Sequence, residues 1–214
     1  MDAIRAQTRP EEWANAASHA LGVALACAVW PWLAEVAERQ GGVRGVVAIA
    51  IFVATMALQY AVSTAYHALP PGRAKRWARS ADHAAIFLFI AGSATPFMLG
   101  LLGNDAGVAT CVVVWLLALA GAALKMTRRL TSARLSTGLY ILFGWFVALL
   151  AWPDLQQLDR SSLAWVVGGG MAYLVGAGFF VFDASLRFGH FIWHLFVLAG
   201  SGCHVCAVLW PALA

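Results

Sequence analysis

The sequence predicts an all-α membrane protein of seven transmembrane helices, and two observations carry this prediction. Of the 214 residues, 62% are hydrophobic and only 11% are charged, whereas about 25% of the residues of an average soluble domain are charged. Asp, Glu, Lys and Arg are also missing from long runs, and about 20 mainly apolar residues suffice for a helix to cross a bilayer. Taken as helices, these runs give the approximate spans 13–34, 45–69, 83–103, 106–124, 135–152, 161–181 and 188–210.

The ends of the first three predicted helices carry local signals. The first apolar run starts near Trp13 and is longer than the apolar region of a cleaved signal peptide, so we expect it to be retained. The second helix should end at Pro70-Pro71-Gly72, and Pro96 should bend the third. The connections between the later runs are short, so we expect a single domain over residues 1–214.

The basic residues are distributed unevenly between the two ends of the predicted helices. One side would carry only Arg39, Arg44 and Arg160. The other side would carry Arg5, Arg9, Arg73, Lys75, Arg76, Arg79, Lys125, Arg128, Arg129, Arg134 and Arg187. Because basic loops stay in the cytoplasm, we expect a cytoplasmic N-terminus and a periplasmic C-terminus in a bacterial inner membrane. The net charge of +4 then reports topology, and nucleic-acid binding is not expected.

Ionisable side chains at one predicted membrane face indicate a site. His67 and Asp82 lie at the ends of the second and third runs, and His190 and His194 begin the last one. The last two are spaced i, i+4, so their rings project from one helix face. Ionisable groups inside a membrane span are costly and usually mark function. Three imidazoles and a carboxylate suit a zinc ion that keeps one position open for water.

Other chemistry-bearing residues have simpler interpretations. A lone histidine at the end of a span is often interfacial, so His67 alone would be a weak signal. His83 adjoins Asp82 but points about 100° away on a helix, which favours packing or indirect support. His204 lies too far along the last helix to share the site. Cys203 and Cys206 form a C-x-x-C inside a predicted span, where buried cysteines behave as small hydrophobic residues.

Several motifs resemble those of the progestin and adiponectin receptor family, most closely its bacterial haemolysin III branch. The resemblance runs from Glu12 to about His204. It rests on Glu12-Trp13-Ala14-Asn15, Ser18-His19-Ala20-Leu21-Gly22, Ser63-Thr64-Ala65-Tyr66-His67, Ser80-Ala81-Asp82-His83, Gly92-Ser93-Ala94-Thr95-Pro96-Phe97 and His190-Phe191-Ile192-Trp193-His194.

The resemblance implies a fold, a metal and a reaction. It implies seven helices with a cytoplasmic N-terminus and a Zn²⁺ ion bound directly by His67, His190 and His194. Asp82 would contact the ion through water, and Ser63 would lie beside it, so these two are the expected catalytic residues. The implied activity is ceramidase-like hydrolysis of an amide or ester bond in a membrane lipid, with a role in membrane homeostasis.

Two alternatives remain open at this point. The protein could be a non-enzymatic membrane regulator or a cytolysin in which zinc is structural. An ion or metal transporter is a further possibility, but transporters tend to show inverted repeats and midplane sites, and this sequence shows neither. The sequence does not indicate the oligomeric state.

Overall fold

The computed structural model describes residues 7–100, 105–183 and 185–213, and it confirms an all-helical membrane protein. Within these ranges, six helices are long and apolar enough to cross a membrane. A five-residue π-helix, η1, follows the second of them. In chain order the elements are α1 (Arg9–Ala68), α2 (Arg73–Thr95), η1 (Pro96–Gly100), α3 (Asp105–Met126), α4 (Ala133–Leu155), α5 (Arg160–Val181) and α6 (Gly189–Leu213).

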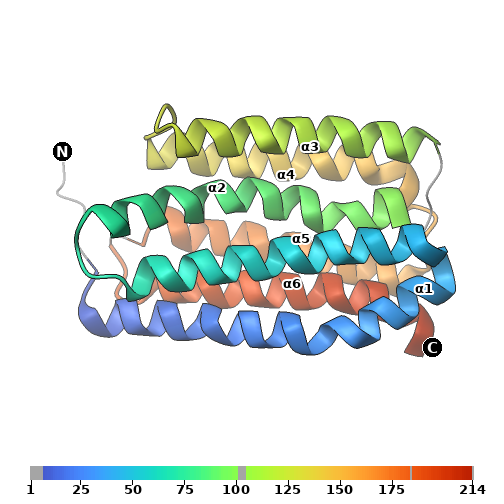
Figure 1. Ribbon diagram of the computed structural model, residues 1–214, viewed down its shortest axis with the longest axis horizontal. Coiled ribbons are helices and arrows are strands. Elements are labelled where there is room, and N and C mark those ends of the chain that lie inside the picture. The colour runs from blue at the N-terminus through green and yellow to red at the C-terminus, as the bar shows by residue number, and fades with distance from the viewer. Residues whose placement is uncertain (1–6, 101–104, 184, 214) are drawn as a thin grey trace.

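Helix α1 doubles back on itself, so the first two predicted spans belong to one element. Its backbone leaves helical geometry at Gly42, where φ is 56° and ψ is −147°, a conformation that glycine adopts without steric cost. A first arm (9–41) and a second arm (43–68) then lie side by side (Figure 1), and the rings of His19 and Tyr60 from the two arms are 5.0 Å apart. The prediction of seven separate helices is therefore not confirmed in the described residues, which form six.

The helices lie along one long axis, and the two ends of the bundle differ in the connections they carry. Figure 1 shows the start of α1 at one end, together with the connections α1–α2, α3–α4 and α5–α6. The turn at Gly42, the connection α4–α5 and the last turns of α6 lie at the opposite end. We call these the N-terminal end and the C-terminal end of the bundle. The chain thus starts and finishes at opposite ends.

The third predicted span differs most from the structure. Helix α2 begins at Arg73, ten residues before the expected start, because the basic segment Arg73–Arg79 is itself helical. Asp82, expected at the beginning of this helix, instead lies within it and is buried. At its other end the α-helix stops at Thr95 and Pro96 opens η1, where proline cannot donate the backbone hydrogen bond that would continue the helix.

Apolar side chains face both the interior and the surroundings, as in a membrane-embedded bundle. Leu33, Ile49, Phe52 and Met98 are fully buried in the core. On α3 and α4, large apolar residues such as Leu116, Leu142 and Leu149 are well exposed. Large apolar side chains exposed in this way suit lipid as solvent.

Helices α5 and α6 approach closely through glycines. A Cβ atom at Gly176 would lie 2.6 Å from the Cβ of Phe196, and one at Gly200 would lie 2.5 Å from the ring of Tyr173. Small residues allow this approach between membrane helices. It brings the start of α6 against the end of α5, which fixes where His190 and His194 lie.

Candidate metal centre

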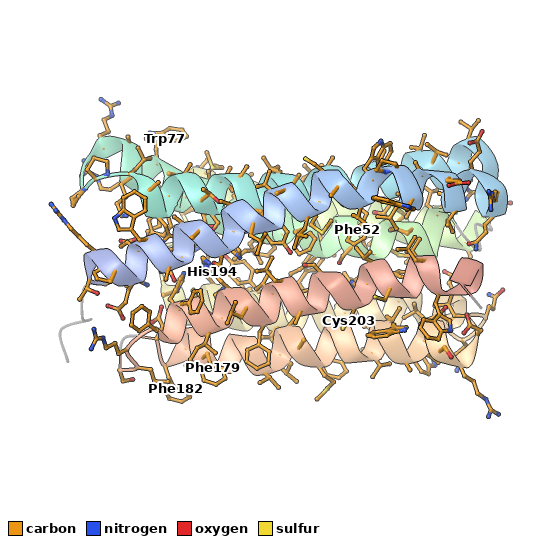
Figure 2. The ribbon with its side chains drawn as sticks, turned by 90° about the horizontal axis from the view of Figure 1, so that it is seen from below. Phe52, Trp77, Phe179, Phe182, His194 and Cys203 are labelled. Atoms are coloured by element: carbon orange, nitrogen blue, oxygen red, sulfur yellow. The ribbon has the colours of Figure 1, made fainter. Side chains whose placement is uncertain are left out.

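The structure brings His67, His190 and His194 together at the N-terminal end of the bundle. Each can offer one ring nitrogen to a common point, with these atoms all within 4.8 Å of one another. The ring centroids form a triangle with sides of 5.0 Å, 5.1 Å and 4.8 Å. Figure 2 shows His194 between α6 and the first arm of α1, well away from Phe52 farther along the bundle. The three residues that the sequence indicates as metal ligands therefore converge from α1 and α6.

A carboxylate orients His67, which lies one residue before the end of α1. Its Nδ1 donates to Glu12 Oε2 at 2.7 Å, and the other oxygen of Glu12 pairs with Lys75 Nζ at 2.9 Å. Lys75 also donates to the carbonyl oxygens of Tyr66 and Leu69, which have no partner within the helix. The lysine thus caps the end of α1 and anchors the carboxylate that holds the imidazole.

A second carboxylate orients His190 at the start of α6. Its Nδ1 donates to Asp183 Oδ2 at 2.9 Å. Asp183 lies in the connection between α5 and α6, where Phe188 has a positive φ of 58°. The N–H of Phe188 donates to Glu11 Oε1 at 2.9 Å, which ties this connection to the beginning of α1.

Backbone and hydroxyl groups orient His194, one turn farther along α6. Its Nδ1 lies 3.2 Å from the carbonyl oxygen of Asn15 and 3.1 Å from Ser18 Oγ. Ser18 itself donates to the Asn15 carbonyl at 2.8 Å. The first arm of α1 therefore accepts the Nδ1 proton of His194, and the imidazole is held in one tautomer.

This arrangement fits a metal ion. Each ring uses Nδ1 for an acceptor supplied by the protein, which leaves Nε2 to bind an ion, as in the carboxylate–histidine pairs that support zinc. Nε2 of His67 is buried and has no hydrogen-bond partner among the described residues. An unpaired buried imidazole nitrogen is costly, and a metal ion would satisfy it. Three neutral imidazoles suit zinc, copper, iron or nickel.

Asp82 and Ser63 lie beside this cluster without belonging to it. Asp82 accepts a hydrogen bond from Gln59 Nε2 at 3.1 Å, and its carboxyl interacts with the side chain of Ser63. Gln59, Ser63 and His67 follow one another at i, i+4, i+8 on the second arm of α1, so they share a face. The carboxylate and hydroxyl expected near the metal thus flank the histidines from α2 and α1.

The other histidines of the sequence lie outside the cluster. His83 packs against Phe180 with ring centroids 6.2 Å apart, and its carbonyl accepts from the Tyr140 hydroxyl. His204 lies deep in α6 between Tyr173 and Phe97. His19 is in the N-terminal half of the bundle and stacks on His194, with 3.6 Å between the ring centroids.

The residues that orient the ligands were not predicted from sequence. Glu12, Asn15 and Ser18 lie on one face of α1, spaced i, i+3 and i+6, and such a polar stripe on an apolar helix could have indicated them. Asp183 had no such signal. It reaches His190 across an irregular connection, and helical periodicity does not apply there.

Comparisons with known proteins place the chain in a family. The model of the family described as haemolysin-III related matches residues 7–205. Hemolysin-3 of Bacillus cereus is 36% identical over 205 residues, which cover 95% of this chain and 92% of that protein. The Hemolysin-3 homolog of Bacillus subtilis is 35% identical over 202 residues, which cover 94% of each chain.

The similarity extends to a mammalian protein. The human monocyte to macrophage differentiation factor is 29% identical over 128 residues, which cover 59% of this chain and 52% of that protein. No solved structure gives a significant match. These relatives bear out the resemblance inferred from the motifs: the chain belongs to the haemolysin-III-related family, the bacterial branch of the progestin and adiponectin receptor family.

Proposed function

We propose that the protein is a zinc-dependent membrane hydrolase that cleaves amide or ester bonds in lipids. The observation that carries this proposal is the set of three buried imidazoles, each fixed through Nδ1, with ligand atoms within 4.8 Å of one another. Three protein ligands leave a fourth position for water or substrate, which is the arrangement of catalytic zinc sites.

The chain's own residues supply the rest of the proposed chemistry. A bound zinc ion would lower the pKa of a water molecule and polarise a carbonyl. Asp82 would orient the water and accept its proton, and the Ser63 hydroxyl would donate to the oxygen on which charge develops. Hydrolysis adds water across the C–N or C–O bond and releases a fatty acid together with an amine or an alcohol. A membrane lipid is the proposed substrate because the histidines lie within spans that lipid surrounds.

The proposed topology has seven membrane passes, because the two arms of α1 each cross the bilayer. The described basic residues at the N-terminal end of the bundle are Arg9, Arg73, Lys75, Arg76, Arg79, Lys125, Arg128, Arg129 and Arg187. These basic residues outnumber Arg39, Arg44 and Arg160 at the opposite end. Because the more basic side of a membrane protein stays in the cytoplasm, their number favours a cytoplasmic N-terminus in a bacterial inner membrane, with the histidines near the cytoplasmic face. A reporter fused after Ala214 should then read periplasmic. A cytoplasmic reading would contradict the topology.

A second candidate function is cytolysis or another non-enzymatic membrane role with a structural zinc ion. The name of the relative from Bacillus cereus, Hemolysin-3, favours it. The two candidates differ in what Asp82 does. In a catalytic site it acts on a metal-bound water molecule, whereas a structural metal site has no water to activate.

The test presents purified, zinc-loaded protein with a panel of amide- and ester-linked lipids and follows the released fatty acid. We expect Asp82→Asn to retain most of the zinc and to lose about 10²–10⁴ in rate, the usual contribution of general acid–base catalysis. Asp159→Asn, which changes an exposed carboxylate at the C-terminal end of the bundle, is the matched control. Full zinc occupancy without turnover on any lipid would favour the non-enzymatic role, and turnover that survives Asp82→Asn would contradict the proposed role of Asp82.

A further inference from the structure

His19 has hydrogen-bonding groups that the protein leaves unused. Its side chain is only 2% exposed, and neither ring nitrogen has a hydrogen-bond partner among the described residues. It lies one turn after Asn15 on the first arm of α1, with its ring against Tyr60 on one side and stacked on His194 on the other. An imidazole kept from water with both nitrogens unpaired is costly, so simple packing does not account for this residue type.

The stacking geometry separates His19 from the three ligands. The rings of His19 and His194 are parallel to within 1°, with centroids 3.6 Å apart. An imidazole nitrogen binds an ion through a lone pair in its ring plane, so an ion in the plane of one stacked ring lies out of the plane of the other. His19 is accordingly absent from the group of residues whose ligand atoms converge. It stands next to the metal centre without being placed to bind the same ion.

The polar groups around His19 are already occupied. Ser18 Oγ donates to the Asn15 carbonyl and lies at hydrogen-bond distance from His194. The Tyr60 hydroxyl donates to Ser201 Oγ at 2.5 Å. Deeper in the bundle the space closes, because a Cβ atom at Gly22 would lie 2.8 Å from both Tyr60 and Leu198. The two ring nitrogens of His19 therefore have no hydrogen-bond partner in the described part of the fold.

We propose that His19 is a ligand-binding residue of the site, which forms a hydrogen bond to a carbonyl or hydroxyl oxygen of the molecule that enters beside His194. The assignment rests on the metal centre of the proposed function and adds a contact from the first arm of α1. Asp82 and Ser63 flank the ligands from α2 and the second arm. His19 approaches from the first arm of α1, and it contributes to recognition of the bound molecule without contributing to retention of the ion.

The experiment uses cobalt(II)-loaded protein and acetohydroxamate, a small chelator with carbonyl and hydroxyl oxygens. Cobalt content is measured first, and binding is then followed through the visible absorption of the ion. We expect His19→Phe to keep the cobalt content of the unchanged protein and to weaken acetohydroxamate binding about 10-fold, the effect of one lost hydrogen bond. His19→Gln, whose amide reaches about as far as Nε2, should recover most of the affinity.

Two outcomes would overturn the assignment. One is unchanged affinity in His19→Phe, which would make the residue a packing element. The other is loss of cobalt in His19→Phe to the extent seen in His194→Ala, which would make it a ligand. If the aromatic variant does not fold, His19→Gln and His19→Asn decide the matter, because their amides replace different ring nitrogens. We expect their affinities to differ at least 3-fold, and equal affinities would refute a directed hydrogen bond.

These readouts separate the assignment from the proposed hydrolysis. Failure of the unchanged protein to take up cobalt would overturn both proposals. Absence of lipid turnover together with the expected loss of acetohydroxamate affinity would overturn the hydrolase alone and support the role of His19.

Discussion

The two ends of the bundle bury different kinds of side chain. At the N-terminal end, polar side chains such as Gln59, Asp82 and His194 are buried and make hydrogen bonds between helices. In the half toward the C-terminal end, the core is made of residues such as Leu33, Phe52 and Met98. Buried hydroxyls there bond back to their own helix, as Thr95 does to the Ala91 carbonyl and Thr55 to that of Phe52.

The two halves of the bundle differ in how their buried polar side chains are satisfied, and this difference distinguishes the candidate site from ordinary helix packing. Thr55 and Thr95 cost little to bury because a local carbonyl satisfies each hydroxyl. Several polar groups at the N-terminal end instead depend on partners from other helices. Both ring nitrogens of His19 and Nε2 of His67 have no partner among the described residues, as is also true of His204 deeper in α6. Polar residues in a membrane core are expensive and usually functional. Changes at the N-terminal end should therefore alter metal and ligand binding, and changes in the other half should alter stability alone.

The largest expected effect is the loss of metal from His194→Ala. Removing one of three ligands should reduce zinc from about one ion per chain to near zero, and the melting temperature should fall with it, because binding to the folded state stabilises that state. His204→Gln, on the same helix but outside the cluster, is the control. The measurement is zinc content by mass spectrometry of the purified variants. Equal zinc loss in the two variants would contradict the claim that zinc binding depends on His194 and not on His204.

A smaller effect on metal binding is expected from Glu12→Gln. The substitution removes the carboxylate that holds Nδ1 of His67 and pairs with Lys75, and losing such support typically weakens metal affinity about 10–100-fold. Glu35→Gln is the matched control, since Glu35 is exposed and forms its ion pair with Arg39, within one turn of the same helix. Competition with a chromophoric chelator measures both affinities. An unchanged affinity in Glu12→Gln would show that the carboxylate does not support the ligand.

Helix packing away from the histidines should affect stability and leave metal affinity unchanged. A Cβ atom at Gly92 would lie 1.9 Å from Thr55 Oγ1, so Gly92→Ala should lower the free energy of unfolding by about 1–3 kcal/mol. Gly170→Ala is the control, because no atom lies within 4 Å of its Cβ position. Thermal unfolding and a zinc titration of both variants test this. A weakened zinc affinity in Gly92→Ala would mean that packing and binding are coupled.

The smallest expected effect concerns pH at the start of α5. Hydrogen bonds from the Ser162 side chain, and from the backbone N–H groups of Ser162 and Ser161, lower the pKa of Asp159. A lowered pKa in the folded state means that the cap stabilises the protein above the unfolded-state pKa and is lost as pH falls through the folded-state pKa. Asp159→Ala should therefore reduce the melting temperature slightly at pH 7, and the difference from the unchanged protein should vanish in strong acid. A difference that persists in acid would contradict the cap.

The sequence predicted the ligands better than their surroundings. His67, His190 and His194 could be found because histidines at the ends of apolar runs stand out, and the i, i+4 pair defines a face. The sequence separated the spans 13–34 and 45–69, and in the structure the chain is helical on both sides of Gly42, where the backbone leaves helical geometry for a single residue. Asp82 was placed at a helix start because charge marked the membrane boundary, whereas α2 continues through its basic first turns.

The support for the ligands depends on tertiary contacts that periodicity does not encode. Asp183 reaches His190 through an irregular connection, and Glu12 reaches His67 across the two arms of α1, 55 residues apart in sequence. Such pairs are determined by how the helices pack. The periodicity of one predicted helix therefore identifies its charged residues but not their partners on other segments.

X-ray absorption spectroscopy of the zinc-loaded protein tests the central claim most directly, because it counts the ligands and identifies their atoms. The account predicts three imidazole nitrogens and one oxygen at about 2.0–2.1 Å, and it predicts that one imidazole is lost in His67→Ala. A shell closed by four protein ligands, a sulfur ligand, or a spectrum unchanged by His67→Ala would contradict a metal centre built on His67, His190 and His194.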